Sequence, residues 1–162
     1  MKKLKVYLDT SVISHLDAPD TPEKMQDTLK LWEYIRAGKY EVFISPVVIL
    51  ELDDCAEPKR SFLANQLQDI YFNELESSDE VIELAAQYSK AGILPPKCVR
   101  DRQHIAYACV YDCDMIVSWN FKHMVNYKTI SGVKSVNALA GYKEMPIYTP
   151  TMLIEGGTEN DT

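Results

Sequence analysis

The sequence of 162 residues contains no hydrophobic run long enough to cross a membrane. Its longest apolar stretches, such as residues 47–50, fall far short of the ~20 residues that a membrane-spanning helix requires. The chain begins with Met1-Lys2-Lys3, as a signal peptide could. The apolar segment of a signal peptide does not follow, because Lys5 and Asp9 are charged. We therefore expect a soluble, cytoplasmic protein with no membrane partner.

An excess of basic charge is also absent. The chain has 17 Lys and Arg against 24 Asp and Glu, which gives a net charge of −7. A protein that binds nucleic-acid phosphates with its whole surface is basic, so any nucleic acid must be held locally. The contents of hydrophobic residues (46%) and charged residues (25%) are those of an ordinary folded domain, which excludes overall disorder. We place one domain at residues 1–155 and a flexible polar tail at residues 156–162.

The four cysteines lack a zinc-binding spacing. Cys55, Cys98, Cys109 and Cys113 form neither a C-x-x-C motif nor a Cys/His zinc pattern. Cys109 and Cys113 would lie one helical turn apart, which permits metal binding without indicating it. We therefore expect reduced, structural thiols.

Short strand-like segments alternate with longer helix-like ones. The expected strands are residues 5–8, 40–45, 70–72 and 114–118. The expected helices lie between residues 22 and 38, 46 and 55, 58 and 67, 80 and 92, 101 and 111, and 127 and 139. This alternation predicts an α/β domain with a mainly parallel sheet. In such sheets, functional groups gather outside the carboxyl ends of the strands.

Four polar residues are candidates for such functional groups. Asp9 follows the first expected strand and Asn120 follows the fourth. Glu51 and Asp101 lie on the apolar sides of two expected helices. An inward carboxylate is costly unless a positive or hydrogen-bonding group meets it.

Among the basic residues, Arg100 and Arg102 adjoin Asp101 in sequence but face other sides of the helix. Inward acids without a cationic partner suggest a bound ion, and oxygen ligands favour Mg²⁺ or Mn²⁺ over zinc. A water molecule on such an ion can attack a phosphodiester.

Each of these residues, taken alone, also has a simpler explanation. Residues 9–11 can be a turn that closes a strand, and Glu51 can be a partly exposed helical acid. Asp101 can be an acid in the first turn of a helix, where the helix dipole stabilises a negative charge. His104, one turn from Asp101, is expected to be a packing histidine rather than a base.

Several short motifs occur in a fixed order along the chain. They are Leu8-Asp9-Thr10-Ser11, the helix around Glu51, Asp101-x-x-His104-Ile105-Ala106-x-Ala108, Ser118-Trp119-Asn120-Phe121-Lys122-His123, and a closing segment from Ile147 to Leu153. In this order and spacing the chain resembles, over about residues 4–150, the PIN domain family, and in particular the bacterial single-domain VapC-like toxins. The resemblance implies a three-layer α/β/α fold with a central sheet of four to five strands. It also implies a Mg²⁺- or Mn²⁺-dependent ribonuclease, an RNA substrate, an antitoxin partner and a homodimer.

The resemblance further assigns roles to individual residues. It implies that Asp9, Glu51 and Asp101 bind the metal and are catalytic. The fourth acidic position of the family falls at Asn120, which is implied to be catalytic as well. Asparagine can ligate through its carbonyl oxygen but adds no charge, so this departure affects the second metal position rather than the first.

The acidic surface predicts a local basic rim for RNA. Without the three site acids the net charge is −7 + 3 = −4, so long-range attraction of RNA is weak. Lys122 and Arg102 flank the site residues in sequence, and we expect both to bind RNA. The same acidity suits a basic antitoxin segment.

Two other functions are consistent with the sequence. A catalytically degenerate PIN fold that binds proteins would explain Asn120 and the acidic charge. An aspartyl-phosphate phosphohydrolase would explain Asp9 after the first strand, but that chemistry usually needs a second carboxylate two residues later, where this chain has Ser11.

Overall fold

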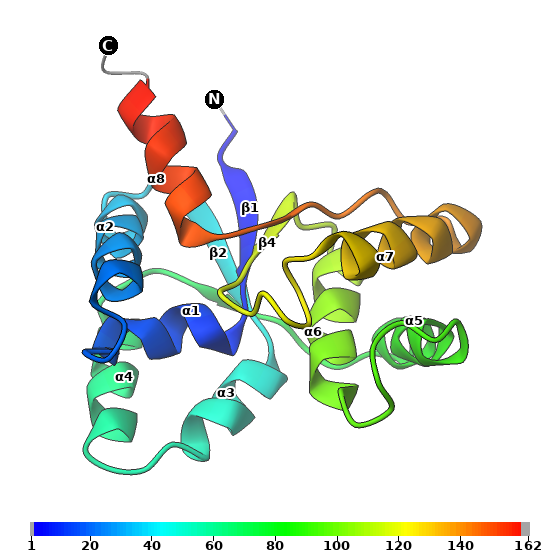
Figure 1. The fold of residues 1–162 in the computed structure, drawn as a ribbon, viewed down its shortest axis with the longest axis horizontal. Coiled ribbons are helices and arrows are strands. Elements are labelled where there is room, and N and C mark those ends of the chain that lie inside the picture. The colour runs from blue at the N-terminus through cyan, green and yellow to red at the C-terminus, as the bar shows by residue number, and fades with distance from the viewer. Residues whose placement is uncertain (1, 160–162) are drawn as a thin grey trace.

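A parallel sheet of five strands forms the centre of the molecule (Figure 1). The computed structural model describes residues 2–159. The strands are β1 (Leu4–Leu8), β2 (Tyr40–Ile44), β3 (Asn73–Glu74), β4 (Met115–Val117) and β5 (Ile147–Tyr148). Their order across the sheet is β3-β2-β1-β4-β5, and every neighbouring pair is parallel. The predicted parallel α/β sheet of four to five strands is confirmed.

Helices cover both faces of this sheet. They are α1 (Thr10–Ser14), the 3-10 turn η1 (His15–Asp17), α2 (Pro22–Arg36), α3 (Pro46–Asp53), α4 (Lys59–Gln68), α5 (Asp79–Lys90), α6 (Val99–Val110), α7 (Tyr127–Ala140) and α8 (Pro150–Glu159). Figure 1 shows α1, α2 and α4 on one side of the sheet and α5, α6 and α7 on the other. This arrangement is the expected three-layer α/β/α fold.

The last helix overlaps the segment that was expected to be a tail. α8 packs against α2 and runs to Glu159. Residues 160–162 lie outside the described part of the chain, so a flexible tail at residues 156–162 stays a prediction. None of the helices within residues 2–159 has the length and apolar character needed to cross a membrane.

Local sequence signals explain where several helices begin and end. The Ser45 hydroxyl accepts a hydrogen bond from the Val47 amide, and proline at the first helical position starts α3 as expected. In α5 the capping residue is Ser78, one residue later than the expected Ser77. α7 ends at Gly141, whose φ of 89° is readily adopted only by glycine.

The third strand does not lie at residues 70–72, and that prediction is wrong. The strand is Asn73–Glu74 instead. Ile70 closes the end of α4, because its amide donates to the carbonyl of Leu67 and its side chain is buried in the core. Tyr71 is 94% exposed and pairs with no strand. The β-prone composition of this segment therefore reflects a helix end and a surface residue.

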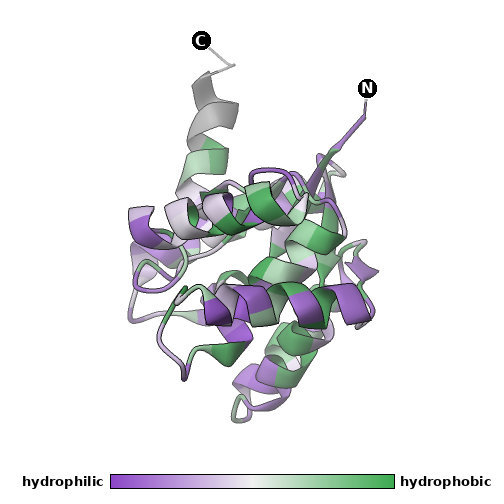
Figure 2. Cartoon of the chain, turned by 90° about the vertical axis from the view of Figure 1, so that its right-hand side faces the viewer, coloured by the Kyte–Doolittle hydropathy of each residue, from purple (hydrophilic) through white to green (hydrophobic). Residues whose placement is uncertain are grey.

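The core lies between the sheet and both helical layers. Val6, Tyr7 and Leu8 of β1 are all buried, as expected for a parallel strand with both faces covered. In α5 the buried residues Val81, Leu84 and Tyr88 recur at helical spacing. Figure 2 views the molecule from the side of α5, α6 and α7 and shows hydrophobic and hydrophilic residues alternating along the helices there.

The chain connections bring four segments to one edge of the sheet. β1 leads into α1, β2 leads into α3, and β4 leads into the segment that starts at Ser118. The parallel strands all end at this edge, and α3 contacts α6. The expected site residues follow these strands and lie on these helices.

Candidate active site at the carboxyl edge of the sheet

Asp9 directly follows β1 and caps the short helix α1. It is 4% exposed. Its Oδ1 accepts hydrogen bonds from the Ser11 hydroxyl at 2.5 Å and from the Val12 amide at 3.4 Å. Its Oδ2 accepts a hydrogen bond from the Ser118 hydroxyl at 2.5 Å. Burial raises the pKa of Asp9 above its usual value, and the nearby His104 and the two hydroxyls offset this only in part.

Glu51 lies on α3 and is held by donors from two other segments. Its Oε1 accepts hydrogen bonds from the Thr10 hydroxyl at 2.7 Å and from Nε2 of His104 at 2.6 Å. Partial burial acts to raise the pKa of Glu51, but the hydrogen bonds from His104 and Thr10 outweigh it and hold the pKa below its usual value. The structure therefore favours an ionised Glu51.

His104 is buried and packs edge-on against Tyr7, as expected, and it also hydrogen-bonds to Glu51, which was not expected. It is 2% exposed. Because the carboxylate of Glu51 only accepts, Nε2 of His104 carries a proton. Its Nδ1 lies 2.6 Å from the Tyr7 hydroxyl, which in turn lies 2.8 Å from the Ser45 hydroxyl. A buried polar chain thus fixes the orientation of the imidazole that holds Glu51.

Asp101 occupies the first turn of α6 and faces the segment after β4. Its Oδ2 lies 3.2 Å from Nδ1 of His123. Burial raises the pKa of Asp101, His104 and His123 act to lower it, and the negative charge of Glu51 adds to the rise. The inference that the inward acids lack a basic partner is therefore wrong, because two histidines fill that role.

Asn120 holds the segment that follows β4. Its Oδ1 accepts a hydrogen bond from the His123 amide at 3.0 Å, and its own amide donates to the Ser118 hydroxyl at 2.9 Å. The Ser11 hydroxyl also accepts from the Trp119 amide at 2.9 Å. Asn120 is thus linked through Ser118 to Asp9, as its place after β4 suggested.

Two of the four predicted residues line one cavity, and the other two lie at the ends of neighbouring strands. A cavity of about 440 Å³ is lined by both Glu51 and Asp101, together with Cys98 and His123. Asp9 is connected to it through its electrostatic interaction with His104, which also interacts with Glu51 and Asp101. Sequence reasoning missed His104, Ser118 and His123.

The donor set suits a hard divalent ion held partly through water. Asp9 and Asp101 are carboxylates whose burial penalises the charged form, and a cation would relieve that penalty. However, Asp9, Glu51 and Asp101 do not bring their ligand atoms within 4.8 Å of one another in the described structure. Mg²⁺ usually keeps several waters and binds directly to one or two carboxylates, so the wider spacing fits a hydrated ion.

Arg102 cannot contact RNA, so that prediction is wrong. Its side chain is 4% exposed. Its guanidinium donates to the carbonyl oxygens of Ile93, Pro95 and Pro96 at 3.4, 2.8 and 3.0 Å. Arg102 therefore ties the loop between α5 and α6 to the start of α6. Its position next to Asp101 in the sequence could not reveal that the side chain is buried.

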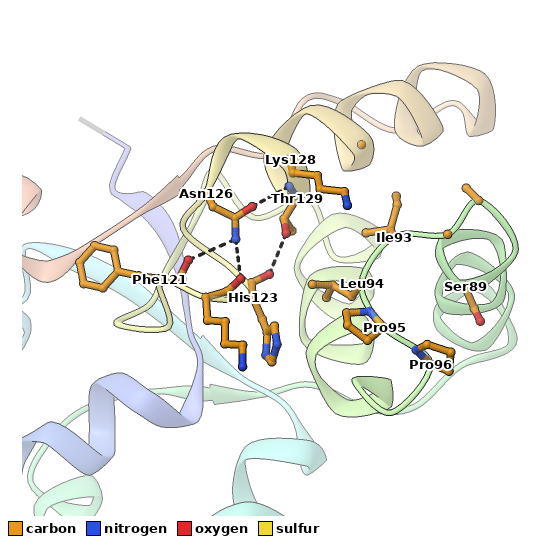
Figure 3. A pocket seen from close by; sticks show the side chains of 14 residues that line it. Ser89, Ile93, Leu94, Pro95, Pro96, Phe121, His123, Asn126, Lys128 and Thr129 are labelled. Carbon is orange, nitrogen blue, oxygen red and sulfur yellow. Dashed lines mark hydrogen bonds between the residues drawn. The ribbon is translucent and has the colours of Figure 1, made fainter.

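Lys122 lines a second cavity that adjoins the first at His123. This cavity has a volume of about 810 Å³. Figure 3 shows the loop from Ile93 to Pro96 on one side of it and the start of α7, with Lys128, on the other. Asn126 fixes its wall, because its amide nitrogen donates to the carbonyls of Phe121 and Lys122 (Figure 3).

The four cysteines are free thiols, as expected. Burial raises the pKa of Cys109 and raises that of Cys113 to about 12, which suits structural thiols. Cys98 differs from them, because it lines the first cavity beside Asp101 and His123.

Comparison with known proteins identifies the fold. No protein-family model and no curated protein sequence matches this chain. Solved structures are similar to it. One is VapC20 of Mycobacterium tuberculosis, which is described as a toxin that cleaves the sarcin–ricin loop. It matches with a TM-score of 0.56 and 16% sequence identity, and the match covers 86% of this chain and 97% of VapC20. VapBC2 from Rickettsia felis, solved with a DNA fragment from its promoter, has a TM-score of 0.56 and 14% identity, over 90% and 98%.

The three-layer architecture is a PIN-like α/β/α fold. Within that class, the chain has the fold of the VapC toxins.

Proposed function

We propose that this protein is a Mg²⁺- or Mn²⁺-dependent endoribonuclease that hydrolyses RNA phosphodiester bonds and acts as the toxin of a toxin–antitoxin pair. One observation carries the proposal: Glu51 and Asp101, from two distant helices, line one cavity, and Asp9 and Asn120 are linked through Ser118 at the carboxyl ends of β1 and β4. The description of VapC20 as an RNA-loop-cleaving toxin supports the choice of substrate class.

Asp9, Glu51 and Asp101 are the residues that would hold the ion. Once bound, such an ion lowers the pKa of a coordinated water and offsets the charge that develops on the phosphodiester. The chain itself supplies orientation. Ser11 and Ser118 hold the two oxygens of Asp9, and His104 and Thr10 hold one oxygen of Glu51. The other oxygen of Glu51 has no hydrogen bond within the described structure and can face the cavity.

Asn120 has a positioning role in this proposal. One lone pair of its Oδ1 accepts from the His123 amide, and the second can accept from a water in the site. Because the side chain is neutral, it adds no attraction for a second ion. We expect one tightly held ion rather than two.

The second cavity provides a path for RNA beside the acids. Lys122 and Lys128 line it and can each neutralise a phosphate. The cavity meets the acidic site at His123, so a strand bound there would lead toward Asp101.

An antitoxin and a second copy of the chain complete the proposal. The net charge of −7 suits a basic antitoxin segment, and the structure of VapBC2 with promoter DNA supports a partner of this kind. The homodimer is proposed by resemblance to the VapC family.

Cleavage of single-stranded RNA by the purified protein tests the proposal. We expect cleavage in Mg²⁺ or Mn²⁺ and a loss of about 100-fold or more in Asp101→Ala, with an unchanged circular dichroism spectrum. Asp79→Ala is the matched control, since Asp79 is the exposed first-turn acid of α5 and lies outside both cavities. Wild-type activity in Asp101→Ala would remove Asp101 from the catalytic set.

A non-enzymatic PIN fold is the second candidate. It is favoured by the contacts of Glu51 with His104 and of Asp101 with His123, which give both acids a hydrogen-bonding partner without an ion. In that case Mn²⁺ would not bind and RNA would not be cleaved. The phosphohydrolase alternative is less well supported, because both oxygens of Asp9 accept hydrogen bonds and the carboxylate is buried.

A further inference from the structure

A group of three side chains of mixed chemistry lies beside the proposed Mg²⁺ site. The ligand atoms of Cys98, Asp101 and His123 all lie within 4.8 Å of one another. The Cys98 sulfur is 3.7 Å from Nε2 and 3.8 Å from Nδ1 of His123, and Oδ2 of Asp101 is 3.2 Å from Nδ1. Glu51, also at this cavity, is not part of the group.

Two of the three separations, sulfur to nitrogen and nitrogen to oxygen, are close to those of a tetrahedral transition-metal site. With metal–sulfur bonds of about 2.3 Å and metal–nitrogen or metal–oxygen bonds of about 2.0 Å, tetrahedral angles place sulfur and nitrogen about 3.5 Å apart. The same angles place nitrogen and oxygen about 3.3 Å apart. Both values lie within a few tenths of an ångström of the observed distances, so small rotations of the side chains suffice.

The backbone holds all three residues in place. Cys98 caps α6 and Asp101 lies three residues later, so both side chains are on one face of the helix start. The Cys98 amide donates to the Pro95 carbonyl at 2.9 Å. His123 is fixed from both sides. Its amide donates to Oδ1 of Asn120, and its carbonyl accepts from the Thr129 hydroxyl (Figure 3).

The surroundings leave one coordination position open. Cys98 is 7% exposed, whereas Asp101 and His123 are partly exposed at the mouth of the 440 Å³ cavity. A water can therefore complete a four-coordinate ion. The basic Lys97 and Arg100 also line the cavity, but Arg100 is turned to Asp54 at 3.1 Å.

The chemistry of this group differs from that of the proposed Mg²⁺ site. A thiolate and an imidazole select Zn²⁺ and similar ions, whereas Mg²⁺ and Mn²⁺ prefer oxygen ligands. The two groups share Asp101, which cannot serve both ions fully.

We propose that Cys98, Asp101 and His123 form a Zn²⁺ site, and that Zn²⁺ bound there withdraws Asp101 from the nuclease centre and inhibits RNA cleavage. On binding, the Cys98 thiol loses its proton to solvent, and bonds form from the ion to sulfur, imidazole nitrogen and carboxylate oxygen. The inhibitory part rests on the proposed ribonuclease function, whereas the binding part does not.

Binding is tested with Co²⁺ as a spectroscopic substitute for Zn²⁺, on the metal-free full chain. We expect one equivalent of Co²⁺ to give a thiolate-to-cobalt absorption in the near ultraviolet, and Zn²⁺ to abolish it. Cys98→Ser and Cys98→Ala should lack this absorption. Cys55→Ser should keep it, since Cys55 is a partly exposed thiol outside the cavity.

Two results would overturn the binding site. One is the absence of the absorption in the wild type, and the other is its persistence in both folded Cys98 variants. Circular dichroism establishes that each variant is folded. Loss of the absorption in Cys55→Ser would likewise contradict the proposal, because it would show that Cys55 provides the thiolate.

Inhibition is tested by titrating Zn²⁺ into the Mn²⁺-supported cleavage of RNA. We expect Cys98→Ser to cleave normally without Zn²⁺ and to need about 10-fold more Zn²⁺ or higher for half inhibition. Equal inhibition of both proteins would overturn the shared role of Asp101. If no protein cleaves RNA while the cobalt absorption is present, the ribonuclease proposal and the inhibition fail together, but the metal site stands.

Discussion

At the scale of single residues, the three site acids differ in what holds them. Asp9 receives hydrogen bonds from hydroxyls and one amide, whereas Glu51 and Asp101 each contact a histidine. Burial raises the pKa of Asp9, whereas the hydrogen bonds from His104 and Thr10 outweigh the partial burial of Glu51 and lower its pKa. The two residues should therefore affect stability in opposite ways.

Replacing Asp9 by asparagine should stabilise the metal-free protein. The buried charge of Asp9 is penalised by desolvation, and asparagine removes it while keeping an acceptor for Ser11. We expect Tm to rise by about 2–4 °C at pH 7, which corresponds to about 1 kcal/mol in a domain of this size. The exposed Asp20→Asn is the control and should leave Tm unchanged.

The pH dependence of this effect follows from the raised pKa of Asp9. The advantage of Asp9→Asn should be complete above that pKa and should vanish as pH falls below about 3.9, the usual value for aspartate. Thermal melts of both proteins at several pH values measure it. A lower Tm for Asp9→Asn at pH 7 would show that the ionised carboxylate is structurally required.

Glu51 should show the reverse behaviour. Its lowered pKa means that the ionised form stabilises the fold, with the contribution present above about pH 4.3 and lost as pH falls through the folded-state pKa. Glu51→Gln should therefore be less stable than the wild type at pH 7, and the gap should close in acid. A gap that is constant from pH 7 to pH 3 would contradict the assigned hydrogen bond from His104.

The sequence drew attention to the acids of the proposed site but not to their hydrogen-bonding partners. Asp9 and Asn120 could be found because both follow strands of a parallel sheet, whose ends meet at one edge. His104 could not be assigned, because its partners Tyr7 and Glu51 are far away in sequence and the residues around it are apolar. The signal that was available is its spacing, one helical turn from Asp101 on the same face.

At the scale of elements, the loop between α5 and α6 depends on one buried cation. Arg102 donates to the carbonyl oxygens of Ile93, Pro95 and Pro96 in this loop, and the Pro95 carbonyl also accepts from the Cys98 amide. Arg102→Met keeps the aliphatic packing but removes these hydrogen bonds. We expect a loss of about 2–3 kcal/mol, or about 5–10 °C in Tm, measured by thermal unfolding. An unchanged Tm would mean that the loop is held without Arg102.

The segment after β4 and the start of α7 should supply the contacts to RNA. Lys122→Ala and Lys128→Ala should each weaken RNA binding and reduce the slope of log affinity against log salt by about 1. Lys134→Ala is the matched control, since Lys134 lies on α7 outside the cavity and near Glu144. Equal salt slopes for Lys128→Ala and Lys134→Ala would place the RNA elsewhere.

The elements themselves followed from local signals in most places and failed where tertiary context decides. The Ser45-Pro46 start of α3 was predictable, because capping and proline act within one turn. The short strand Asn73–Glu74 was not, because its polar residues pair with β2 only through the fold. Ile70 looked like a strand residue but fills the core at the end of α4.

At the scale of the whole molecule, a bound ion should couple the helices and strands around the site. The three proposed ligands come from α3, α6 and the end of β1, and an ion that binds only the folded chain stabilises it by mass action. With Mn²⁺ at about 100 times its Kd, we expect about 2.7 kcal/mol, or about 5–10 °C in Tm. Asp9→Asn should blunt this rise and Asp20→Asn should not, and an identical rise in all three proteins would place the ion elsewhere.

The fold of the whole chain was more predictable than its chemistry. Alternating strands and helices define the parallel sheet, and the structures of VapC20 and VapBC2 agree with it. Identities of 14–16% establish this fold and leave activity to the site residues. The activity therefore has to be measured on this protein.

The most direct measurement is the cleavage rate of a defined single-stranded RNA by the wild type and by Asp9→Asn, each in Mn²⁺ and in EDTA. We predict that the wild type cleaves the RNA in Mn²⁺ and does not cleave it in EDTA. In Asp9→Asn the cleavage rate in Mn²⁺ should be reduced by about 100-fold or more. Equal rates in Mn²⁺ and EDTA, or equal rates for the two proteins, would contradict the central claim that Asp9 belongs to a metal-dependent ribonuclease site.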